Sequence, residues 1–272
     1  MQRLLQPLEF RQSLRQFLYN RPPNLTNDHH GRCGPRTTDY KNRMTTTKPN
    51  GDDVRLRLYE QFARIGKAIS HPRRLELVEL LAQGERSVEV LANAAQLTVA
   101  NTSQHLQQLR SAGLVTSRKE GLRVFYRLAN DDVGEMLEVM QRLADTTLAE
   151  VNRIVSAYRS LQEQMEPISA TELLQRLKGG SVTLLDVRPH EEYSAGHLPG
   201  AINIPLEELE ARIRELDPQC DVVAYCRGYF CLLADDAVTR LRRSGINARR
   251  LSSGFPKWKR SGLPVETSTR KH

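Results

Sequence analysis

The sequence has 272 residues, of which 39% are hydrophobic and 26% are charged, and its formal net charge is +8. A chain of this length and composition is typical of a globular protein with two domains of roughly 100 residues each. No run of about 18 apolar residues occurs, and Arg3, Arg11 and Arg15 interrupt the first segment, so neither a transmembrane helix nor a signal peptide is expected. We therefore expect a cytoplasmic protein.

The basic excess lies mainly in the first fifty residues. Lys and Arg number nine against three Asp and Glu in residues 1–50, fifteen against fifteen in residues 51–165, and sixteen against fourteen in residues 166–272. Because the first segment is rich in Pro, Gly, Asn and Thr without a sustained period, we expect a disordered leader, with a nucleic-acid-binding tail as the alternative. Met44 is an alternative translation start. His29, His30 and Cys33 are potential metal ligands, but a disordered segment is a poor scaffold for a metal site.

Helical periodicity begins near Val54. Apolar residues then recur at spacings of four, three and four, and these residues are Leu58, Phe62, Ile65 and Ile69. The pair His71-Pro72 ends this helix, because the residue before a proline disfavours helical geometry. A second helix follows, with Pro72 in its first turn and Gly84 as its stop.

A helix-turn-helix is predicted next. Ser87 can cap a short helix that runs through Ala95, and Thr98 can cap a longer helix that Gly113 terminates. The buried stripe of this longer helix consists of Thr102, Leu106 and Leu109. Only the tight turn "QLT" separates the two helices, which is typical of a helix-turn-helix.

A basic hairpin follows the helix-turn-helix. The β-rich runs "LVTSR" and "RVFYRL" flank the turn "KEG", with basic side chains along them: Arg118, Lys119, Arg123 and Arg127. A helix-turn-helix with such a hairpin is a winged helix. The stretch "AISHPRRLELVELLAQGERSVEVLANAAQLTVANTSQHLQQLRSAGLVTSRKEGLRVFYRLA" resembles the ArsR-type bacterial repressors. The resemblance implies that residues 51–165 form an all-α winged helix-turn-helix domain with a β-hairpin wing, used for DNA binding and dimerisation.

The face of the longer helix opposite its buried stripe is free to enter a major groove. Ser and Gln side chains there can contact base edges, and the basic wing suits phosphates or the minor groove. The predicted DNA-binding residues are Ala100, Ser103, Gln104, His105, Gln107, Arg118, Lys119 and Arg123. His105 lies at the edge of the buried stripe, so packing is its alternative role. Many ArsR-type proteins sense metals through a Cys-x-Cys pair, but the matching stretch "RSVEVLA" has no thiol, so no metal site is expected.

The segment after the wing has a heptad pattern over about thirty residues. Its apolar positions are Val133, Leu137, Met140, Ala144, Thr147, Val151, Ile154, Tyr158, Leu161 and Met165. A continuous helix with this seam needs a partner, and the resemblance implies dimerisation through terminal helices. We expect a homodimer that binds a near-palindromic operator in double-stranded DNA, with packing of the seam on its own domain as the alternative.

A second fold is expected over residues 166–272. Glu166-Pro167 ends the long helix, and Ser169 to Glu172 has the form of a capping box. The runs "VTLLDV" and "VVAY" are typical of buried parallel strands and alternate with predicted helices at residues 206–216 and 231–244, which indicates an α/β sheet. Sites in such sheets lie at the C-terminal ends of the strands, where Cys226 follows "VVAY".

The position of Cys226 favours a thiolate. The backbone N–H groups expected around its sulfur are those of Arg227, Gly228, Tyr229 and Phe230. With a helix N-terminus behind the loop and the Arg227 guanidinium nearby, the thiol pKa is expected to fall into the range of roughly 3.5–7.5. Gly228 is expected to permit the tight turn. A buried, inert thiol is the alternative for a lone cysteine at a strand end. The four cysteines are too few and too scattered for a disulfide framework.

The surrounding stretches resemble the rhodanese domain of sulfurtransferases. They are "LLDVRPHEEYSAGHLPGAINIP", "YCRGYFC" and "GFPKWKRSGLPVE". The resemblance implies a parallel sheet with helices on both faces and a catalytic loop of Cys226, Arg227 and Gly228. In such a loop the cysteine accepts a sulfane sulfur as a persulfide and passes it to a thiol acceptor. The resemblance implies structural roles for the two flanking motifs, which contain Asp186, Arg188, Glu192, Gly254, Trp258, Gly262 and Pro264.

Two departures from the family bear on the substrate. Leu232 stands where oxyanion-binding relatives carry an arginine, which disfavours oxyanion reduction and phosphate hydrolysis. Phe230 and Cys231 stand where thiosulfate-using members carry a further cation, so a less charged donor such as a polysulfide fits as well. Cys231 is a candidate resolving thiol for a persulfide on Cys226, closing a disulfide or a sulfur-bridged pair, with a small hydrophobic packing role as the alternative. Cys220 is expected to be a spectator.

The favoured hypothesis is a homodimeric transcriptional repressor whose rhodanese domain handles reactive sulfur, with no cofactor. Sulfur loading would then change its DNA binding. One alternative is a sulfurtransferase in which the winged helix only dimerises or anchors the enzyme. Another is a metal-dependent repressor with an inert rhodanese-like domain, which lacks clustered ligands in the sequence.

Overall fold

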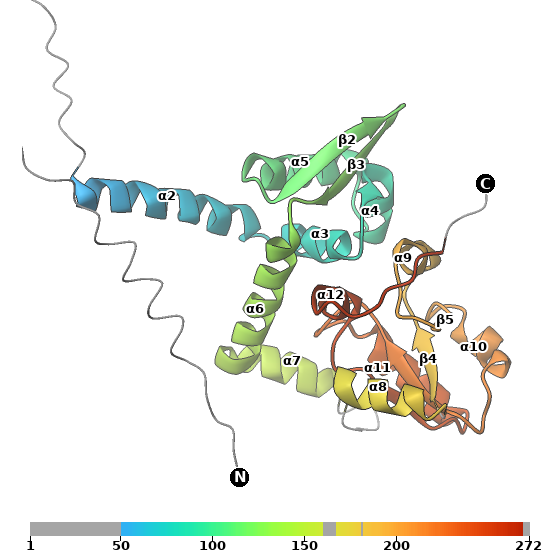
Figure 1. Cartoon of the computed structure of the whole chain (residues 1–272). Coiled ribbons are helices and arrows are strands. Elements are labelled where there is room, and N and C mark those ends of the chain that lie inside the picture. The colour runs from blue at the N-terminus through green and yellow to red at the C-terminus, as the bar shows by residue number, and fades with distance from the viewer. Residues whose placement is uncertain (1–49, 160–166, 181, 269–272) are drawn as a thin grey trace, which may run out of the picture. The chain divides into compact units, whose positions relative to one another are not determined.

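The computed structural model describes residues 50–159, 167–180 and 182–268 (Figure 1). The predictions for the leader, for Met44 as a start and for the group of His29, His30 and Cys33 lie outside the described residues. None of the described helices is both long enough and apolar enough to cross a membrane.

The first part of the described chain is mainly helical. Its elements are α2 (Gly51–Ile69), α3 (Pro72–Ala82), β1 (Arg86–Ser87), α4 (Val88–Ala94), α5 (Val99–Ser111), β2 (Val115–Glu120), β3 (Arg123–Leu128), α6 (Asp131–Thr147) and α7 (Ala149–Arg159). The predicted caps of the helix-turn-helix are confirmed. Ser87 accepts a hydrogen bond from the N–H of Val90 at 3.4 Å, and Thr98 accepts one from the N–H of Asn101 at 3.2 Å. Between the two helices Gln96 takes the left-handed conformation, with φ of +52°, which reverses the chain.

The wing is an antiparallel hairpin extended by a short strand that the sequence did not predict. Strand order is β1-β3-β2, and Arg86 and Ser87 of β1 lie opposite Tyr126 and Phe125 of β3. The hairpin reverses at Gly121, whose φ of +59° suits a residue without a side chain. Because Ser87 also caps α4, β1 joins the wing directly to the helix-turn-helix.

One hydrophobic core unites these elements. Its fully buried members include Leu77 of α3, Leu91 of α4, and Leu106 and Leu109 of α5. Val133 and Leu137 of α6 close the same core, so α6 packs against the winged helix. The predicted winged helix-turn-helix with a β-hairpin wing is therefore confirmed.

The predicted long helix is two helices. α6 ends at Thr147, Leu148 is extended with φ of −106° and ψ of 101°, and α7 begins at Ala149. The hydroxyls of Thr146 and Thr147 donate to the carbonyl of Leu143 at 3.0 and 2.7 Å, bonds that compete with regular helix at this end. Figure 1 shows α7 leaving the end of α6 at a sharp angle. The prediction of one continuous heptad helix is therefore wrong, because apolar spacing does not report a break in the backbone.

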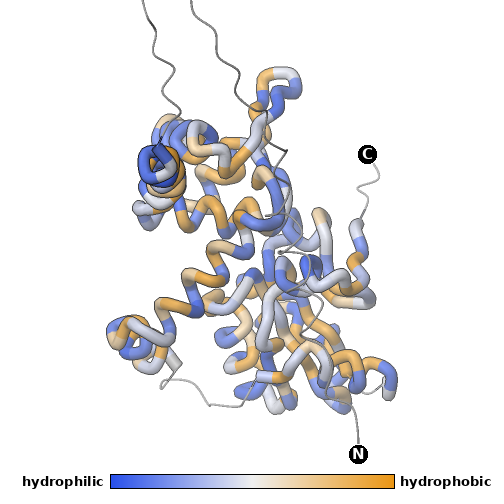
Figure 2. Tube along the Cα trace, turned by 60° about the vertical axis from the view of Figure 1, so that its left-hand side comes forward, coloured by the Kyte–Doolittle hydropathy of each residue, from blue (hydrophilic) through white to orange (hydrophobic). Residues whose placement is uncertain are grey.

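Three helices of this part present apolar side chains to solvent, and Figure 2 shows hydrophobic residues alternating with hydrophilic ones along α6. The exposed large apolar residues of α2, α6, α7 and the break between α6 and α7 are Val54, Leu56, Leu58, Tyr59, Phe62, Val139, Leu143, Leu148 and Ile154. The predicted seam positions Leu161 and Met165 lie outside the described residues. Isolated exposed apolar residues are ordinary, whereas a series of them on α2, α6 and α7 is a candidate surface for association.

The second part of the chain alternates strands and helices. Its elements are α8 (Ala170–Lys178), β4 (Val182–Asp186), α9 (His190–Ala195), β5 (Ile202–Asn203), α10 (Leu209–Arg212), the 3-10 helix η1 (Ile213–Glu215), β6 (Asp221–Tyr225), α11 (Leu233–Arg243), β7 (Ala248–Arg250) and α12 (Phe255–Arg260). Ser169 accepts a hydrogen bond from the N–H of Glu172 at 3.1 Å, so the predicted cap of α8 is confirmed. α11 begins two residues later than predicted, which leaves Cys231 and Leu232 in the preceding loop.

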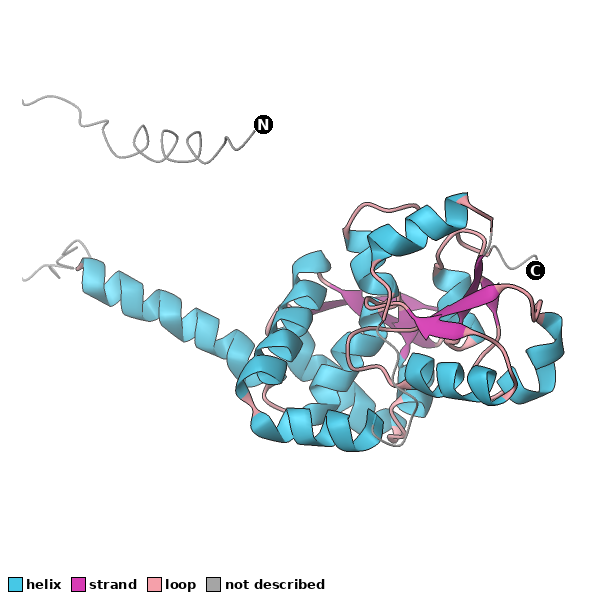
Figure 3. Cartoon of the chain, turned by 90° about the horizontal axis from the view of Figure 1, so that it is seen from below, coloured by secondary structure: helices cyan, strands magenta, loops and turns pink. Residues whose placement is uncertain are grey.

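All four strands of the second sheet are parallel, in the order β5-β4-β6-β7. Side chains alternate across the sheet, so Leu184 and Val223 pack with α8 and α12 on one face, while Leu185 and Val222 pack with α11 on the other. Figure 3 shows helices on both faces of these strands. The predicted α/β rhodanese-like sheet with helices on both faces is confirmed.

Candidate functional site

Helix α5 has the predicted polar face. Its stripe of Thr102, Leu106 and Leu109 is buried. Ala100, Gln104 and Gln107 are exposed on the other side, and Ser103 is half-buried. A shallow open hollow runs along this face, lined by Thr98, Ala100, Asn101, Ser103, Gln104 and Gln107. The predicted base-contacting residues thus share one accessible surface, with the exception of His105.

His105 packs inside the winged helix. Its ring lies 4.7 Å from that of His71, centroid to centroid, and it is half-buried. Burial lowers the pKa of His105, and the charges of His71, Arg74 and Arg73 lower it further. Among the described residues no hydrogen-bond partner reaches its buried Nδ1. These contacts favour the packing role over DNA contact.

The basic residues of the wing are not equivalent. Arg118 donates to Glu85 through Nε and Nη2, at 2.9 and 2.6 Å, pairs with Glu120 through Nη1, and lies 4.6 Å from the centre of the Phe125 ring. Lys119 and Arg123 are exposed, and within the described ranges neither has an ion pair. Arg118 is thus held by two carboxylates, whereas Lys119 and Arg123 are available to a ligand.

Cys226 and Cys231 face each other in the loop between β6 and α11. Cys226 is 4% exposed, and its Sγ donates to the carbonyl oxygen of Cys231 at 3.3 Å. Cys231 is half-buried, and its N–H donates to the carbonyl of Gly228 at 3.2 Å. Both thiols are free. The loop thus brings together the two cysteines that the sequence nominated for sulfur chemistry.

The electrostatics of the two thiols differ from the prediction. Burial raises the pKa of Cys226 well above its ordinary value, and its hydrogen bond with Cys231 raises it further. The hydrogen bond from Cys226 lowers the pKa of Cys231, with help from the N–H groups of Leu233 and Arg227 and from the Arg227 charge. The predicted low pKa of Cys226 is therefore wrong. The two pKa shifts thus have opposite directions, and Cys231 is the more acidic of the two thiols.

Arg227 explains part of this difference, because its guanidinium pairs with Glu192 and does not lower the pKa of Cys226. Nε and Nη2 of Arg227 donate to the Glu192 carboxylate of α9 at 3.0 and 2.6 Å. Glu192 is fully buried. Burial raises the pKa of Glu192, but the hydrogen bond and charge of Arg227 and the charges of Arg86 and Arg188 outweigh it, so the net shift is downward. Glu192 is thus held as a carboxylate beside the loop.

The structure requires glycine at Gly254 and not at Gly228, where the sequence predicted that a glycine permits the tight turn. At Gly228 a Cβ atom would meet nothing within 4 Å, and φ lies outside the left-handed region, so the turn does not require glycine there. At Gly254 a Cβ atom would lie 2.3 Å from the carbonyl carbon and oxygen of Arg227. The N–H of Phe255 also donates to the carbonyl of Cys226 at 3.1 Å. The start of α12 therefore supports the loop backbone, a function the sequence did not reveal.

The other nominated residues have structural surroundings. Asp186 and Arg188 are fully buried, and Nε of Arg188 donates to both carboxylate oxygens of Asp186 at 2.9 and 3.1 Å. Trp258 is buried and donates to the carbonyl of Pro264 at 2.8 Å. Cys220 is half-buried, and its hydrogen bond to Asp217 raises its thiol pKa. No group of three or more potential metal ligands occurs within the residues that the structure describes.

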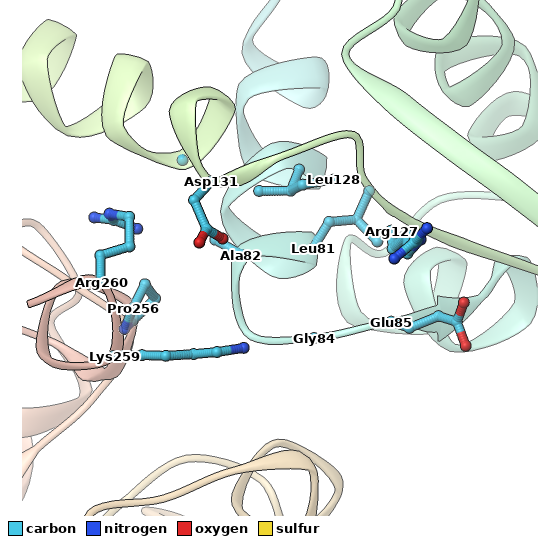
Figure 4. A pocket seen from close by; sticks show the side chains of 11 residues that line it. Leu81, Ala82, Gly84, Glu85, Arg127, Leu128, Asp131, Pro256, Lys259 and Arg260 are labelled. Atoms are coloured by element: carbon cyan, nitrogen blue, oxygen red, sulfur yellow. The ribbon is translucent and has the colours of Figure 1, made fainter. Parts of the chain in front are cut away.

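A cavity of about 190 Å³ lies between residues of α12 and the winged helix (Figure 4). Its polar lining combines Arg127, Asp131 and Glu85 with Lys259 and Arg260 of α12. In Figure 4 the Lys259 side chain extends toward Gly84, and Arg260 points away from it toward α6. Arg260 is paired with Glu138 of α6. The cavity contains neither thiol, so it is separate from the cysteine loop.

Comparison with known proteins agrees with both folds. The model of the arsR family of bacterial regulatory proteins matches residues 71–117, and the model of the rhodanese-like domain matches residues 169–261. The HTH-type transcriptional regulator Rv0324 of Mycobacterium tuberculosis is 48% identical over 214 residues, which are 79% of this chain and 94% of that protein. YqhL of Bacillus subtilis is 31% identical over 106 residues, which are 39% of this chain and 81% of that protein.

A solved winged helix-turn-helix DNA-binding domain from Mycobacterium bovis, described as homodimeric, is 45% identical; the match covers 35% of this chain and 89% of that one, with a TM-score of 0.34. The similarity to the Mycobacterium tuberculosis regulator spans nearly all of that protein. The chain therefore belongs to the arsR family of HTH-type transcriptional regulators, in a form that also carries a rhodanese-like domain.

Proposed function

We propose that this transcriptional regulator binds operator DNA as a homodimer and that sulfane sulfur, accepted by Cys226 and Cys231, weakens this binding. The observation that supports the sulfur chemistry most directly is the cysteine pair of the loop: Sγ of Cys226 donates to the carbonyl oxygen of Cys231 at 3.3 Å, and the pKa of Cys226 is raised while that of Cys231 is lowered. A nucleophile with a proton acceptor beside it is the arrangement that activates thiols at neutral pH. The proposed place of action is the cytoplasm, where operator DNA is found.

The proposed first step forms a persulfide on Cys226. Sγ of Cys226 attacks the outer sulfur of a persulfide or polysulfide donor, and its proton passes to the Cys231 thiolate. The sulfur–sulfur bond of the donor breaks, and the shortened donor leaves as a thiolate with the bonding electron pair. The step needs no external oxidant, because the donor is reduced as the Cys226 sulfur is oxidised.

The second step makes use of the second thiol. Cys231 gives up its proton and attacks the Cys226 sulfur that is bonded to Cβ. A disulfide between Cys226 and Cys231 forms, and the outer sulfur leaves as hydrosulfide, which takes up the proton. A thiol acceptor that reaches the persulfide first would instead carry the outer sulfur away, which is the transferase reaction of the alternative hypothesis.

The DNA-binding part of the proposal rests on the exposed polar face of α5. Gln104 and Gln107 can contact base edges in a major groove, and Lys119 and Arg123 suit the neighbouring phosphates. The exposed apolar residues of α2, α6 and α7 support a homodimer, because two copies that cover these surfaces would bury them both. The two recognition helices would then lie about one helical turn of DNA apart, roughly 10 bp.

Cysteine variants test the sulfur chemistry. After polysulfide treatment, mass spectrometry of the wild type is expected to detect one added sulfur or the disulfide, and sulfur transfer to cyanide should be measurable. Cys226→Ser should abolish the disulfide and the transfer to cyanide, because a hydroxyl cannot form the Cys226 persulfide. Cys231→Ser should accumulate the persulfide without the disulfide. Cys220→Ser is the matched control, since Cys220 lies outside the loop. Equal residual transfer in Cys226→Ser and Cys220→Ser would remove Cys226 from the mechanism.

A base-contact variant tests the DNA part. Gln104→Ala is expected to lose discrimination at particular base pairs, by about 1–3 kcal/mol each, while its affinity for unrelated DNA stays the same. The measurement is a binding titration with the duplex upstream of the regulator's own gene and with single-base variants of it. An unchanged preference in Gln104→Ala would show that α5 does not contact the bases.

A further inference from the structure

The buried carboxylate of Glu192 has a second cationic partner, and this partner comes from the winged helix. Nη2 of Arg86, in β1, lies 3.2 Å from Oε1 of Glu192. The same oxygen accepts from Nη2 of Arg227 at 2.6 Å. Arg86 is 8% exposed and Glu192 is 0% exposed, so neither charge is solvated by bulk water. One carboxylate oxygen thus joins the winged helix to the residue that follows Cys226.

A second buried contact lies close to the first. Nη1 of Arg188, in the rhodanese-like fold, donates to Oε1 of Gln83 at 3.1 Å, and both side chains are buried. Gln83 follows α3, three residues before Arg86. The short segment between α3 and α4 is therefore fixed at both ends by polar groups of the rhodanese-like fold.

This segment belongs to the DNA-binding machinery. Arg86 lies opposite Tyr126 of β3 in the wing, and the next residue, Ser87, caps α4. A displacement of Arg86 therefore moves the wing strand and the first helix of the helix-turn-helix together. On the other side Glu192 holds Arg227, whose backbone N–H and positive charge both act on Cys231.

Arg86 and Arg227 compete for the same oxygen of Glu192. Arg227 donates to Glu192 at 2.6 Å, and its positive charge also acts on Cys231, whose pKa it lowers. When sulfur loading removes a negative charge from Cys231, Arg227 keeps Glu192 as its ion-pair partner and binds it more strongly. Because Arg86 shares one oxygen of Glu192 with Arg227, its own attraction to that oxygen weakens. The loss of one charge at the thiol pair can thus loosen β1.

We infer that Arg86 is a positioning residue that the DNA-binding domain supplies to the cysteine loop, and that the contact of Arg86 with Glu192 carries the effect of sulfur on DNA binding. The inference rests on the proposed function for its direction. It adds a contact that the resemblance to rhodanese domains does not imply, because Arg86 lies outside the rhodanese-like fold. By linkage, DNA binding must in turn change the reactivity of the thiols.

The first test measures the alkylation rate of Cys231 by iodoacetamide against pH in the full-length chain, with peptide mass spectrometry to separate the cysteines. Arg86→Gln should move the midpoint of Cys231 alkylation to higher pH by about half a unit, because Arg227 is then drawn toward Glu192. Below the midpoint, alkylation should be roughly threefold slower. Arg86→Lys keeps the positive charge, so its midpoint should lie closer to the wild-type value. Arg176→Gln is the matched control, since Arg176 pairs with Glu172 and Asp221 away from the loop. A wild-type midpoint in folded Arg86→Gln would overturn the inference.

The second test needs no variant and therefore does not depend on the folding of Arg86→Gln. Saturating the wild type with the duplex upstream of its own gene should shift the same alkylation midpoint, whereas an equal concentration of unrelated duplex should shift it less. An unchanged midpoint with the duplex bound would contradict a link between the two sites.

A third arm separates this inference from the proposed function. If polysulfide weakens operator binding equally in the wild type and in Arg86→Gln, the proposed function stands and the Arg86 contact is not the link. If the wild type accepts no sulfur, the proposed function fails, and the alkylation midpoints still decide whether Arg86 positions the loop.

Discussion

A methyl group at Gly254 should damage the cysteine loop without straining its own backbone. The added Cβ would lie 2.3 Å from the carbonyl carbon of Arg227 and 2.4 Å from the N of Gly228, whereas ordinary contacts begin at 3.4 Å. The loop must therefore retreat by about 1 Å. Gly254 has φ of −88° and ψ of 177°, which alanine adopts freely, so the whole effect comes from the collision.

Two magnitudes follow for Gly254→Ala. Forcing extra volume into a packed site costs about 1–3 kcal/mol of unfolding free energy. A displacement of about 1 Å at reacting groups can slow a reaction on the order of 100-fold. We expect the rate of sulfur transfer to cyanide to fall by at least tenfold. At temperatures where the variant stays folded, its lower unfolding free energy alone would not cause such a loss.

The comparison variant is Gly228→Ala, in the loop itself. A Cβ atom at Gly228 meets nothing within 4 Å, and the substitution keeps its N–H group. Its transfer rate should therefore fall far less than that of Gly254→Ala, with both stabilities measured by urea unfolding. If Gly228→Ala is the more damaging of the two, the account of α12 as the support of the loop is refuted.

Three further predictions follow from the described contacts. Arg123→Ala should weaken binding to all DNA sequences and reduce the slope of log affinity against log salt by about 1. Arg118→Ala should have a smaller effect, because Arg118 already pairs with carboxylates. Salt titrations of DNA affinity measure both, and equal effects would contradict the difference. Because the pKa of Cys231 is lowered, its alkylation should persist at pH values where ordinary thiols and Cys226 stay protonated. Faster alkylation of Cys226 would show that Cys226, and not Cys231, is the more acidic thiol. Phe62→Glu should shift the chain from dimer to monomer in light scattering, and an unchanged mass would exclude α2 from the interface.

The sequence predicted those features that depend on neighbouring residues. The caps at Ser87, Thr98 and Ser169 follow from local hydrogen bonds, and each is present. Periodicity predicted the buried stripe of α5, because one face of a regular helix recurs at fixed spacing. It failed at Leu148, where the apolar spacing continues although the backbone does not remain helical.

The candidate site was only half predictable for a different reason. That Cys226 follows a buried strand is a local fact, and the sequence located it correctly. The direction of its pKa depends on burial and on where Arg227 points, and the partner of Arg227 is Glu192, distant in sequence. Arg86 could not be nominated at all, since neither its burial nor its contact with Glu192 leaves a signal in the residues around it.

The coupling between sulfur and DNA is tested most directly by one titration. The affinity of the wild type for the duplex upstream of its own gene would be measured by fluorescence anisotropy before and after polysulfide treatment, with the modification of Cys226 verified by mass spectrometry in the same sample. A coupling free energy of about 1–3 kcal/mol predicts a 5- to 150-fold loss of affinity, and none in Cys226→Ser. Unchanged affinity in verified, modified wild type would contradict the account and favour a sulfurtransferase whose winged helix acts independently.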